Sequence, residues 1–285
     1  KQYIRHEEPF WSKELLRLSH GKFSAEIVPF DRAGVPGQDM LRLMQLGVVP
    51  LGNLQLNRIA SQEPEFNAPD LAGLNPDMAT LKKNVGAFRL YLEKTLRERY
   101  GIELLTIYVY PAQVVFCKNP LATMADLAGR RTRVSSATGA DFVEAFGGVP
   151  VLTGFSEIMP NMATGNIECA ITGTMSGNTI GLHEVTTHLH TMTATWGLSI
   201  FAANSAAWKG MPPELKALLQ TELPKLEAAI WSESDRETAE GIACNTGSAT
   251  CTDGRQGKMQ LVRSSPADER QRKEIFLSRV LTRWV

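Results

Sequence analysis

The chain has 285 residues, enough for one large domain or two of ordinary size. Hydrophobic residues make up 43% of it, and 30 lysines and arginines balance 30 aspartates and glutamates, so a soluble, globular protein is expected rather than a nucleic-acid partner, which needs a basic face. The sequence contains no apolar run of the ~20 residues that a membrane-spanning helix requires.

Sequence patterns in the first 60 residues predict alternating helices and strands. A helix is expected in EEPFWSKELLRLSHGK, which has acids and a proline in its first turn and ends at a glycine. A strand is expected in FSAEIVPF, where apolar residues occupy every second position. A helix and then a buried strand are expected in GQDMLRLMQLGVVPLGNLQL, and together these elements predict a βαβ unit.

The remaining sequence predicts a second α/β unit and a long helix. Helical periodicity covers MATLKKNVGAFRLYLEKTLRERYG, and two strand-like runs in IELLTIYVYPAQVVFCKNP meet around Pro111. After Pro120, the expected strands RTRVSS, VPVLTG and IECAITG alternate with the expected helices GADFVEAFGG and FSEIMPNMATGN. The longest helical stretch runs from Met211 to Asn245, with Pro212 and Pro213 in its first turn.

Two α/β units joined by strand-rich crossings and a long helix predict two lobes around a ligand cleft. The first lobe is expected over residues 1–111 and 200–240, and the second over residues 112–199 and 241–285. Hinge strands between the lobes are expected near residues 110–113 and 198–202, because closure concentrates dihedral change in a few residues.

The four cysteines differ in their surroundings. Cys244 and Cys251 bracket the polar stretch NTGSAT, which can fold back to close a short disulfide loop. A metal site there is less favoured because the last histidine of the chain is His190. Cys117 and Cys169 lie in apolar, strand-like runs and are expected to be buried free thiols. The expected disulfide indicates an oxidising compartment.

Signatures of catalysis and of cofactor binding are missing from the sequence. It contains no G-x-G-x-x-G, no Walker loop, no H-E-x-x-H and no G-x-S-x-G. The run HEVTTHLH brings His183, His188 and His190 together, but the spacing from 183 to 188 does not match the i, i+4 pairs of helical zinc sites. We therefore predict no catalytic residue, no metal site and no cofactor.

Arg133, in the half-buried strand RTRVSS, requires an anion. The chain itself can supply one as a salt bridge from Glu157 or Asp141. A ligand can supply one as a carboxylate, whose two oxygens match the planar guanidinium through parallel hydrogen bonds. The residues alone leave both alternatives open.

The segment from Leu121 to Thr172 resembles the solute-binding proteins of tripartite ATP-independent periplasmic (TRAP) transporters. In that family a D-L-x-G-x-k-x-R-V strand leads to a helix ending in G-x-x-P-V and then to S-E-x-x-x-A-L-x-x-G-x-x-D. The corresponding residues here are Asp126, Leu127, Gly129, Arg133, Val134, Gly148, Pro150, Val151, Ser156, Glu157, Gly165 and Glu168. The resemblance covers most of the chain, including the stretch from Trp208 through the long helix.

The resemblance implies a two-lobed periplasmic binding protein with an α/β fold and a long helix that spans both lobes. Such a protein captures a small organic acid in the cleft between its lobes and delivers it to the TRAP membrane permease, without catalysis and without being embedded in the membrane itself. The implied location is the periplasm. The family begins with a strand before its first helix, whereas this chain opens with KQYIRHEEPFW and is expected to be a mature or truncated product.

The resemblance also implies which residues contact the ligand. Arg133 is expected to hold the ligand carboxylate, which favours the ligand over a salt bridge. Further contacts are implied at Asn53, Gln55, Gln113, Glu157, Thr172, Gly173, Asn178 and Trp196. Ala112 stands where sialic-acid binders have a second arginine, which argues against a sialic acid. The neutral polar residues favour a hydroxylated or sugar acid.

Two alternative functions remain open from the sequence. One is an enzyme on a two-lobed α/β scaffold, with Glu157 as general base and Arg133 as the anchor of a carboxylate substrate. The other is an ABC-type binding protein, which would lack the long helix that begins near Pro212.

Overall fold

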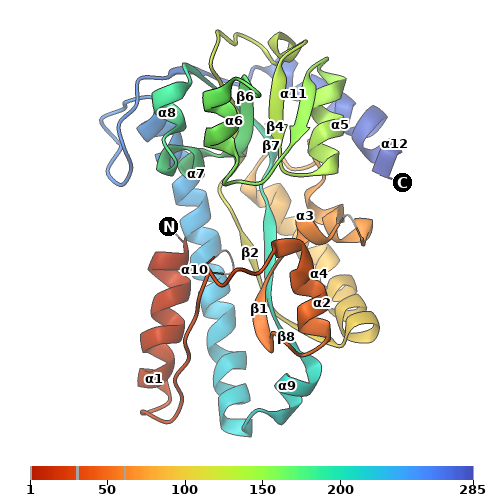
Figure 1. The fold of residues 1–285 in the computed structure, drawn as a ribbon, viewed down its shortest axis with the longest axis vertical. Coiled ribbons are helices and arrows are strands. Elements are labelled where there is room, and N and C mark those ends of the chain that lie inside the picture. The colour runs from red at the N-terminus through yellow and green to blue at the C-terminus, as the bar shows by residue number, and fades with distance from the viewer. Residues whose placement is uncertain (1, 30–31, 61, 285) are drawn as a thin grey trace. The chain divides into compact units, whose positions relative to one another are not determined.

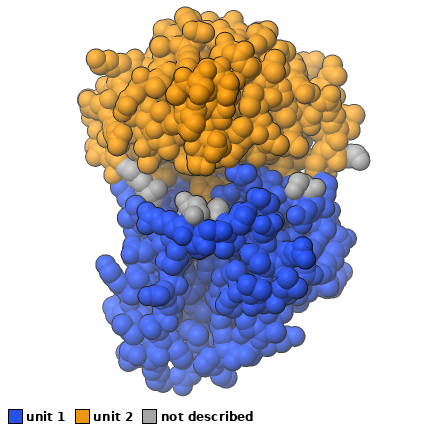
Figure 2. All heavy atoms as spheres, viewed as in Figure 1, with its two compact units in different colours: residues 1–66, 87–109, 198–234 blue, residues 67–86, 110–197, 235–285 orange. Residues whose placement is uncertain are grey.

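A computed structural model of the chain describes residues 2–29, 32–60 and 62–284. The chain divides into two compact units, which Figure 2 colours separately. Unit 1 comprises residues 1–66, 87–109 and 198–234, and unit 2 comprises residues 67–86, 110–197 and 235–285. Residues 67–86 thus belong to unit 2, whereas the sequence boundaries place them in the first lobe.

Unit 1 is built on a three-stranded sheet in the order β1–β8–β2. Its strands are β1 (Leu51–Gln55), β2 (Ile102–Val109) and β8 (Leu198–Asn204), and β8 is antiparallel to both neighbours. Its shorter helical elements are η1 (Tyr3–Glu7), η2 (Phe10–Glu14), α1 (Leu15–Leu18), η3 (Gly37–Asp39), α2 (Met40–Gln45), α3 (Leu56–Ile59) and α9 (Ser205–Gly210). The core includes Phe10, Trp11, Phe201 and Ile230.

The strand predicted in FSAEIVPF does not form over residues 23–29, and Phe30 lies outside the described residues. Phe23, Ala25 and Ile27 are half-buried against the unit 1 core and alternate with exposed residues. The alternation therefore reports burial of one face, not pairing with a neighbouring strand. The predicted βαβ unit is therefore wrong, because its first strand does not form. Its expected second strand, β1, pairs antiparallel with β8 instead.

Unit 2 is built on a six-stranded mixed sheet in the order β5–β4–β6–β3–β7–β9. Figure 1 labels its strands β4, β6 and β7. The strands are β3 (Gln113–Cys117), β4 (Arg131–Val134), β5 (Val149–Leu152), β6 (Cys169–Gly173), β7 (His188–Thr195) and β9 (Gln260–Val262). Strand β4 is parallel to β5 and β6, whereas β3 is antiparallel to β6 and β7. The alternation of strands and helices predicted after Pro120 is confirmed.

Unit 2 also contains nine shorter helical elements within the described residues. They are η4 (Pro64–Asp70, which begins in unit 1), η5 (Met124–Leu127), α5 (Ala137–Ala145), α6 (Ile158–Thr164), α7 (Thr174–Thr179), α8 (Leu182–Val185), α11 (Pro266–Ile275), η6 (Phe276–Val280) and α12 (Leu281–Trp284). Ser136 precedes helix α5 as its N-cap, and its hydroxyl accepts the Gly139 N–H at 3.1 Å. Phe142 and Val143 of α5 are buried in the unit 2 core.

Two helices contribute residues to both units. Helix α4 (Met78–Tyr100) passes from unit 2 into unit 1 after Gly86, and helix α10 (Pro213–Asn245) passes from unit 1 into unit 2 after Ser234. The long helix predicted from the sequence is therefore confirmed. None of the helices in the described part of the chain combines the length and apolar character that a membrane span requires.

Two disulfides lie in unit 2. The predicted Cys244–Cys251 bond is present. The expectation that Cys117 and Cys169 are free thiols is wrong, because they are bonded to each other. They lie directly opposite each other on the antiparallel strands β3 and β6, with their Cα atoms 4.1 Å apart. This register brings the two side chains within bonding distance.

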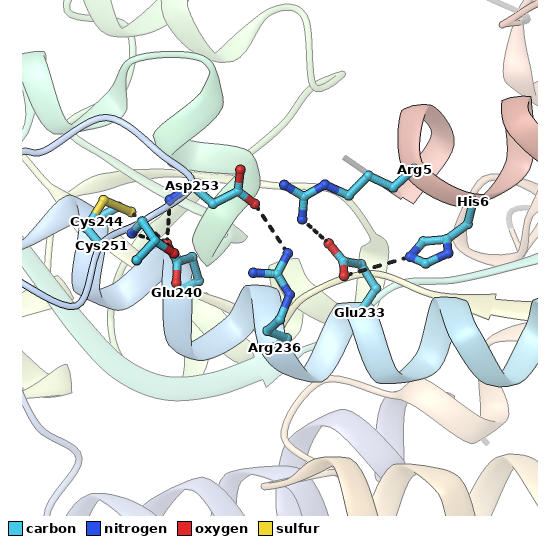
Figure 3. A network of polar contacts seen from close by, with 9 residues as sticks. Arg5, His6, Glu233, Arg236, Glu240, Cys244, Cys251 and Asp253 are labelled. Carbon is cyan, nitrogen blue, oxygen red and sulfur yellow. Dashed lines mark hydrogen bonds and ion pairs between the residues drawn. A yellow bond between two sulfur atoms is a disulfide. The ribbon is translucent and has the colours of Figure 1, made fainter.

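The Cys244–Cys251 loop is fastened to α10 by charged groups (Figure 3). Glu240 Oε1 accepts the main-chain N–H groups of Thr252 and Asp253 at 2.6 and 2.7 Å. Arg236 Nη2 lies 3.2 Å from Asp253 Oδ2. The loop is thus closed by the disulfide, and the residues that follow it, Thr252 and Asp253, are bonded to α10.

The two disulfides are expected to differ in their effect on stability because they close loops of different length. They join residues 52 and 7 positions apart, for which loop-closure entropy gives about 4 and about 2.5 kcal/mol. Replacing Cys117 and Cys169 together by alanine should therefore lower the free energy of unfolding more than replacing Cys244 and Cys251. Chemical denaturation checks the order, and non-reducing peptide mapping checks both linkages. The reverse order, or free thiols at either pair, would contradict the expectation.

Candidate functional site

Arg133 is a buried cation at one end of the unit 2 sheet. Its side chain belongs to β4 and is only 2% exposed. Its Nε donates to the Thr153 carbonyl at 3.1 Å, and its Nη1 donates to the Ile171 carbonyl at 2.9 Å. Thr153 directly follows β5 and Ile171 belongs to β6, so the two strands that flank β4 orient the guanidinium. In α/β sheets, the carboxyl ends of parallel strands are where ligands bind.

The sequence offers two acids as alternative salt-bridge partners of Arg133. Of the two acids considered as salt-bridge partners from the sequence, Asp141 lies 2.5 Å from Arg283 Nη1. Glu157 is exposed and precedes α6. The Arg133 guanidinium, oriented by the carbonyls of Thr153 and Ile171, therefore lies at the end of the sheet where α/β folds bind ligands.

Other predicted contacts lie at the same end of the sheet as Arg133. Thr172 and Gly173 follow Ile171 on β6, and Gln113 at the start of β3 lies opposite Gly173. Gln113 also pairs with Thr195 at the end of β7. The strand register therefore brings together Arg133, Gln113, Thr172 and Gly173 from distant parts of the sequence.

Trp196 is anchored inside unit 2. Its side chain is 3% exposed, and its indole Nε1 donates to the Asn75 carbonyl at 3.1 Å. Its carbonyl accepts Gln113 Nε2 at 3.0 Å. The structure thus places Trp196 next to Gln113, while its predicted role as an apolar wall for the ligand stays a prediction.

Asp70 is a buried acid that holds the segment after β7. Its carboxylate accepts the N–H of Gly197 at 2.7 Å and that of Trp196 at 3.2 Å. Burial raises the pKa of Asp70 to about 7, and the hydrogen bonds from Gly197, Trp196 and Asn75 limit that rise. Sequence reasoning missed this residue, because a single Asp that follows Pro69 and precedes the apolar run LAGL belongs to no distinctive motif.

Asn178 is joined to the segment that follows α10. Its Nδ2 donates to the Arg255 carbonyl at 2.7 Å and to Asn245 Oδ1 at 3.2 Å, and its Oδ1 accepts the Arg255 N–H at 2.8 Å. Both ends of the amide therefore have partners within unit 2. The structure does not group Asn178 with Arg133 through any of these bonds, and its ligand contact stays a prediction.

Asn53 and Gln55 lie on β1 of unit 1. Asn53 Nδ2 donates to the Ser199 hydroxyl at 3.3 Å, whereas its buried Oδ1 has no hydrogen-bond partner among the described residues. Gln55 is half-buried and precedes α3. A buried amide oxygen without a donor costs free energy, and a hydroxyl from a ligand would remove that cost. The contacts at both residues stay predictions.

Thr153 is a polar residue next to Arg133 that the sequence reasoning did not select. Its hydroxyl is buried and has no hydrogen-bond partner within residues 2–29, 32–60 and 62–284. Its carbonyl accepts Arg133 Nε. The available signal was its place directly after the apolar strand VPVL, where a parallel strand ends.

One group of side chains in the described chain has the composition of a metal site, namely Glu240, Cys244 and Cys251. The two cysteines are bonded to each other, and a disulfide sulfur is not the thiolate that binds metals. Glu240 Oε1 already accepts main-chain N–H groups. These residues therefore form a structural clamp, not a metal centre.

Comparisons with known proteins agree with this architecture. The profile of the family described as "Bacterial extracellular solute-binding protein, family 7" matches residues 5–250. Each of three similar solved structures aligns with 96% of this chain. One is a Bordetella pertussis extracytoplasmic solute receptor that binds pyroglutamic acid (21% identity, TM-score 0.84, 87% of that chain covered). Another is a Sulfitobacter TRAP solute-binding protein with bound β-D-galacturonate (16% identity, TM-score 0.81, 87% of that chain covered). The third is a Rhodoferax ferrireducens TRAP solute-binding protein with bound malonate (18% identity, TM-score 0.81, 84% of that chain covered). These likenesses confirm the predicted two-lobed α/β fold with a long helix.

The raised pKa of Asp70 gives stability a defined pH dependence. The folded chain binds the Asp70 proton more tightly than the unfolded chain does, so this contribution is fully present below about pH 4 and is lost as the pH rises through about 7. The free energy of unfolding of the parent, minus that of Asp70→Asn, should therefore fall between pH 4 and 7. Chemical denaturation at several pH values measures it, with Asp77→Asn as an exposed control in the same segment. A difference that is constant or rises over this range would contradict the assignment.

Proposed function

Because the chain belongs to family 7 of the bacterial extracellular solute-binding proteins, we propose that Arg133 holds the carboxylate of a small organic acid that this protein delivers to a TRAP membrane permease. The extracellular character of the family confirms the expected location outside the cytoplasm, in the periplasm. The solved structures named above include TRAP solute-binding proteins, which favours this reading over an ABC-type binding protein.

The burial and orientation of Arg133 carry the proposal. Strand β4 fixes the backbone, and carbonyl groups on both sides fix the guanidinium plane. A ligand carboxylate at this position meets a preorganised, nearly dehydrated donor, so little side-chain freedom is lost when it binds. Charge-assisted, bidentate hydrogen bonds of this kind are among the strongest that proteins make.

The ligands of the similar proteins share one chemical group. Pyroglutamic acid, galacturonate and malonate each carry a carboxylate and differ in the rest of the molecule. This pattern supports one fixed anion anchor surrounded by variable contacts. In this chain the neutral polar groups of Gln113, Thr153 and Thr172 near that anchor suit hydroxyl or carbonyl groups, which supports a hydroxylated or sugar acid.

We propose further that the ligand is released unchanged. The enzyme alternative needs Glu157 to act as a general base on a substrate held by Arg133. Glu157 is exposed to solvent at the start of α6, and not enclosed in a site that excludes water. The function of the family, which is solute binding, supports the same conclusion.

A ligand screen tests the chemical class. L-pyroglutamate, D-galacturonate, malonate and orotate should be added separately while thermal unfolding is followed. An acid present at ~100 times its dissociation constant should stabilise the fold by about 2.7 kcal/mol. Mass spectrometry of the acid after incubation should find it chemically intact. Stabilisation only by molecules without a carboxylate, or conversion of the acid, would contradict the proposal.

Substitution of Arg133 tests the anchor. Arg133→Ala should weaken binding of an acid found in the screen by roughly 2 to 5 kcal/mol, or ~30-fold to several thousand-fold, because the carboxylate loses a desolvated, charged partner. Arg133→Lys keeps the charge but loses the planar fork, so it should recover only part of the affinity. Calorimetry measures all three proteins.

Arg131→Ala is the matched control for this experiment. Arg131 lies on the same strand but is exposed, and its guanidinium donates to the carbonyls of Gly165 and Asn166. Its removal should leave the affinity near that of the parent. Parent-like affinity in Arg133→Ala, or equal losses in both variants, would show that Arg133 is not the anchor.

A further inference from the structure

One peptide group in unit 2 connects a buried carboxylate to a glutamine side chain. The N–H of Gly197 donates to Asp70 Oδ2 at 2.7 Å. The carbonyl of Trp196, which belongs to the same peptide group, accepts Gln113 Nε2 at 3.0 Å. This peptide is trans, so its N–H and C=O point in opposite directions. Asp70 and Gln113 therefore lie on opposite sides of it.

Asp70 is well placed to fix this peptide group. Its side chain is buried, and its carboxylate also accepts the Trp196 N–H and lies 3.5 Å from Asn75 Nδ2. Hydrogen bonds to an ionised acceptor are stronger than those between neutral groups. They also polarise the next bond in a chain, so the carboxylate strengthens the bond that the Trp196 carbonyl receives from Gln113.

Gly197 keeps the Gln113 amide against this peptide. Its φ of +94° lies in the left-handed region that favours glycine. A Cβ atom at this position would lie 2.9 Å from Gln113 Nε2. The Gly197 carbonyl in turn accepts the Tyr110 N–H at 3.0 Å. The segment between β7 and β8 is thus joined to the segment that leads into β3.

The hydrogen bond from Gln113 Nε2 to the Trp196 carbonyl determines how the Gln113 side-chain amide is oriented. Gln113 Nε2 donates one of its two hydrogens to the Trp196 carbonyl, which fixes the orientation of the amide and so the position of its oxygen, an acceptor that the half-buried side chain can offer to a ligand. Gln113 lies opposite Gly173 at the end of the sheet that Arg133 occupies. An acceptor at this place selects a ligand group that carries a hydrogen.

We propose that Asp70 is a positioning residue for ligand binding, which acts through the Trp196–Gly197 peptide group to present the Gln113 side-chain oxygen to a hydroxyl or N–H donor of the ligand. This inference rests on the proposed function, because Gln113 is a predicted ligand contact. It narrows the substrate class to acids that carry a hydrogen-bond donor in addition to their carboxylate.

Nuclear magnetic resonance of the ligand-free protein tests the positioning without any ligand. At pH 8 in the parent, Asp70 is mainly ionised, since burial raises its pKa to about 7. Asp70→Asn should shift the resonances of the Gly197 N–H and of the Gln113 side-chain amide, whereas Asp77→Asn should shift neither. A Gln113 amide that does not respond to Asp70→Asn would overturn the proposal. If Asp70→Asn does not fold, a pH titration of the parent replaces it: the Gln113 side-chain amide resonances should shift together with that of the Gly197 N–H as the pH crosses about 7, where Asp70 ionises, whereas those of exposed Gln260 should not. Gln113 resonances that do not respond would overturn the proposal.

Affinities for two donor-bearing probes, L-pyroglutamate and D-galacturonate, test the consequence for binding. Asp70→Asn should weaken binding roughly 3- to 10-fold, the effect of one hydrogen bond. The same substitution in a Gln113→Leu background should have little further effect, because the contact it positions is already gone. Equal losses in both backgrounds would overturn the proposal. If neither these acids nor malonate or orotate bind the parent, the proposed function fails, while the resonance experiment still decides the positioning.

Discussion

The burial of the Arg133 guanidinium is the constraint on which the account of this protein depends. A cation removed from water needs fixed dipoles to orient it and an anion to balance it. Strands β5 and β6 supply the dipoles, as the carbonyls of Thr153 and Ile171. Because β4 lies between these parallel strands, the topology of the sheet places the charge at the edge where ligands bind in α/β folds.

Asp70 is a buried group of the opposite kind, an acid, and main-chain groups stabilise it as well. There the buried group is a carboxyl that is negative when ionised, and N–H groups from Trp196 and Gly197 face it instead of carbonyls. The two sites share one consequence, because each converts a buried charge into a fixed orientation of neighbouring groups. For Arg133 the oriented group is the guanidinium itself, and for Asp70 it is the peptide that holds Gln113.

The sequence predicted the elements that depend on local patterns. Helix α10 follows from its long periodicity and its proline start, and the alternation after Pro120 gave β4, α5, β5, α6 and β6 in their observed order. Arg133 was found because a charged residue in an apolar strand is unusual and because the surrounding motifs resemble a known family. The Cys244–Cys251 bond could be predicted because only a short polar loop separates the two cysteines in the sequence.

The features that sequence reasoning missed depend on pairing between distant segments. The Cys117–Cys169 bond needs the register of β3 against β6, which neither strand encodes alone. The apolar alternation from Phe23 to Ile27 was correct for burial, yet no neighbouring strand pairs with it. Asp70 and Thr153 were missed because their roles lie in contacts with Gly197 and Arg133 that local sequence does not reveal.

A crystal structure of the protein with D-galacturonate, or with the acid that remains bound through purification, tests the central claim most directly. The account predicts that both carboxylate oxygens of the ligand lie within hydrogen-bonding distance, about 2.7 to 2.9 Å, of nitrogen atoms of Arg133. A ligand whose carboxylate is held by other residues, with the Arg133 guanidinium contacting only the protein, would contradict it.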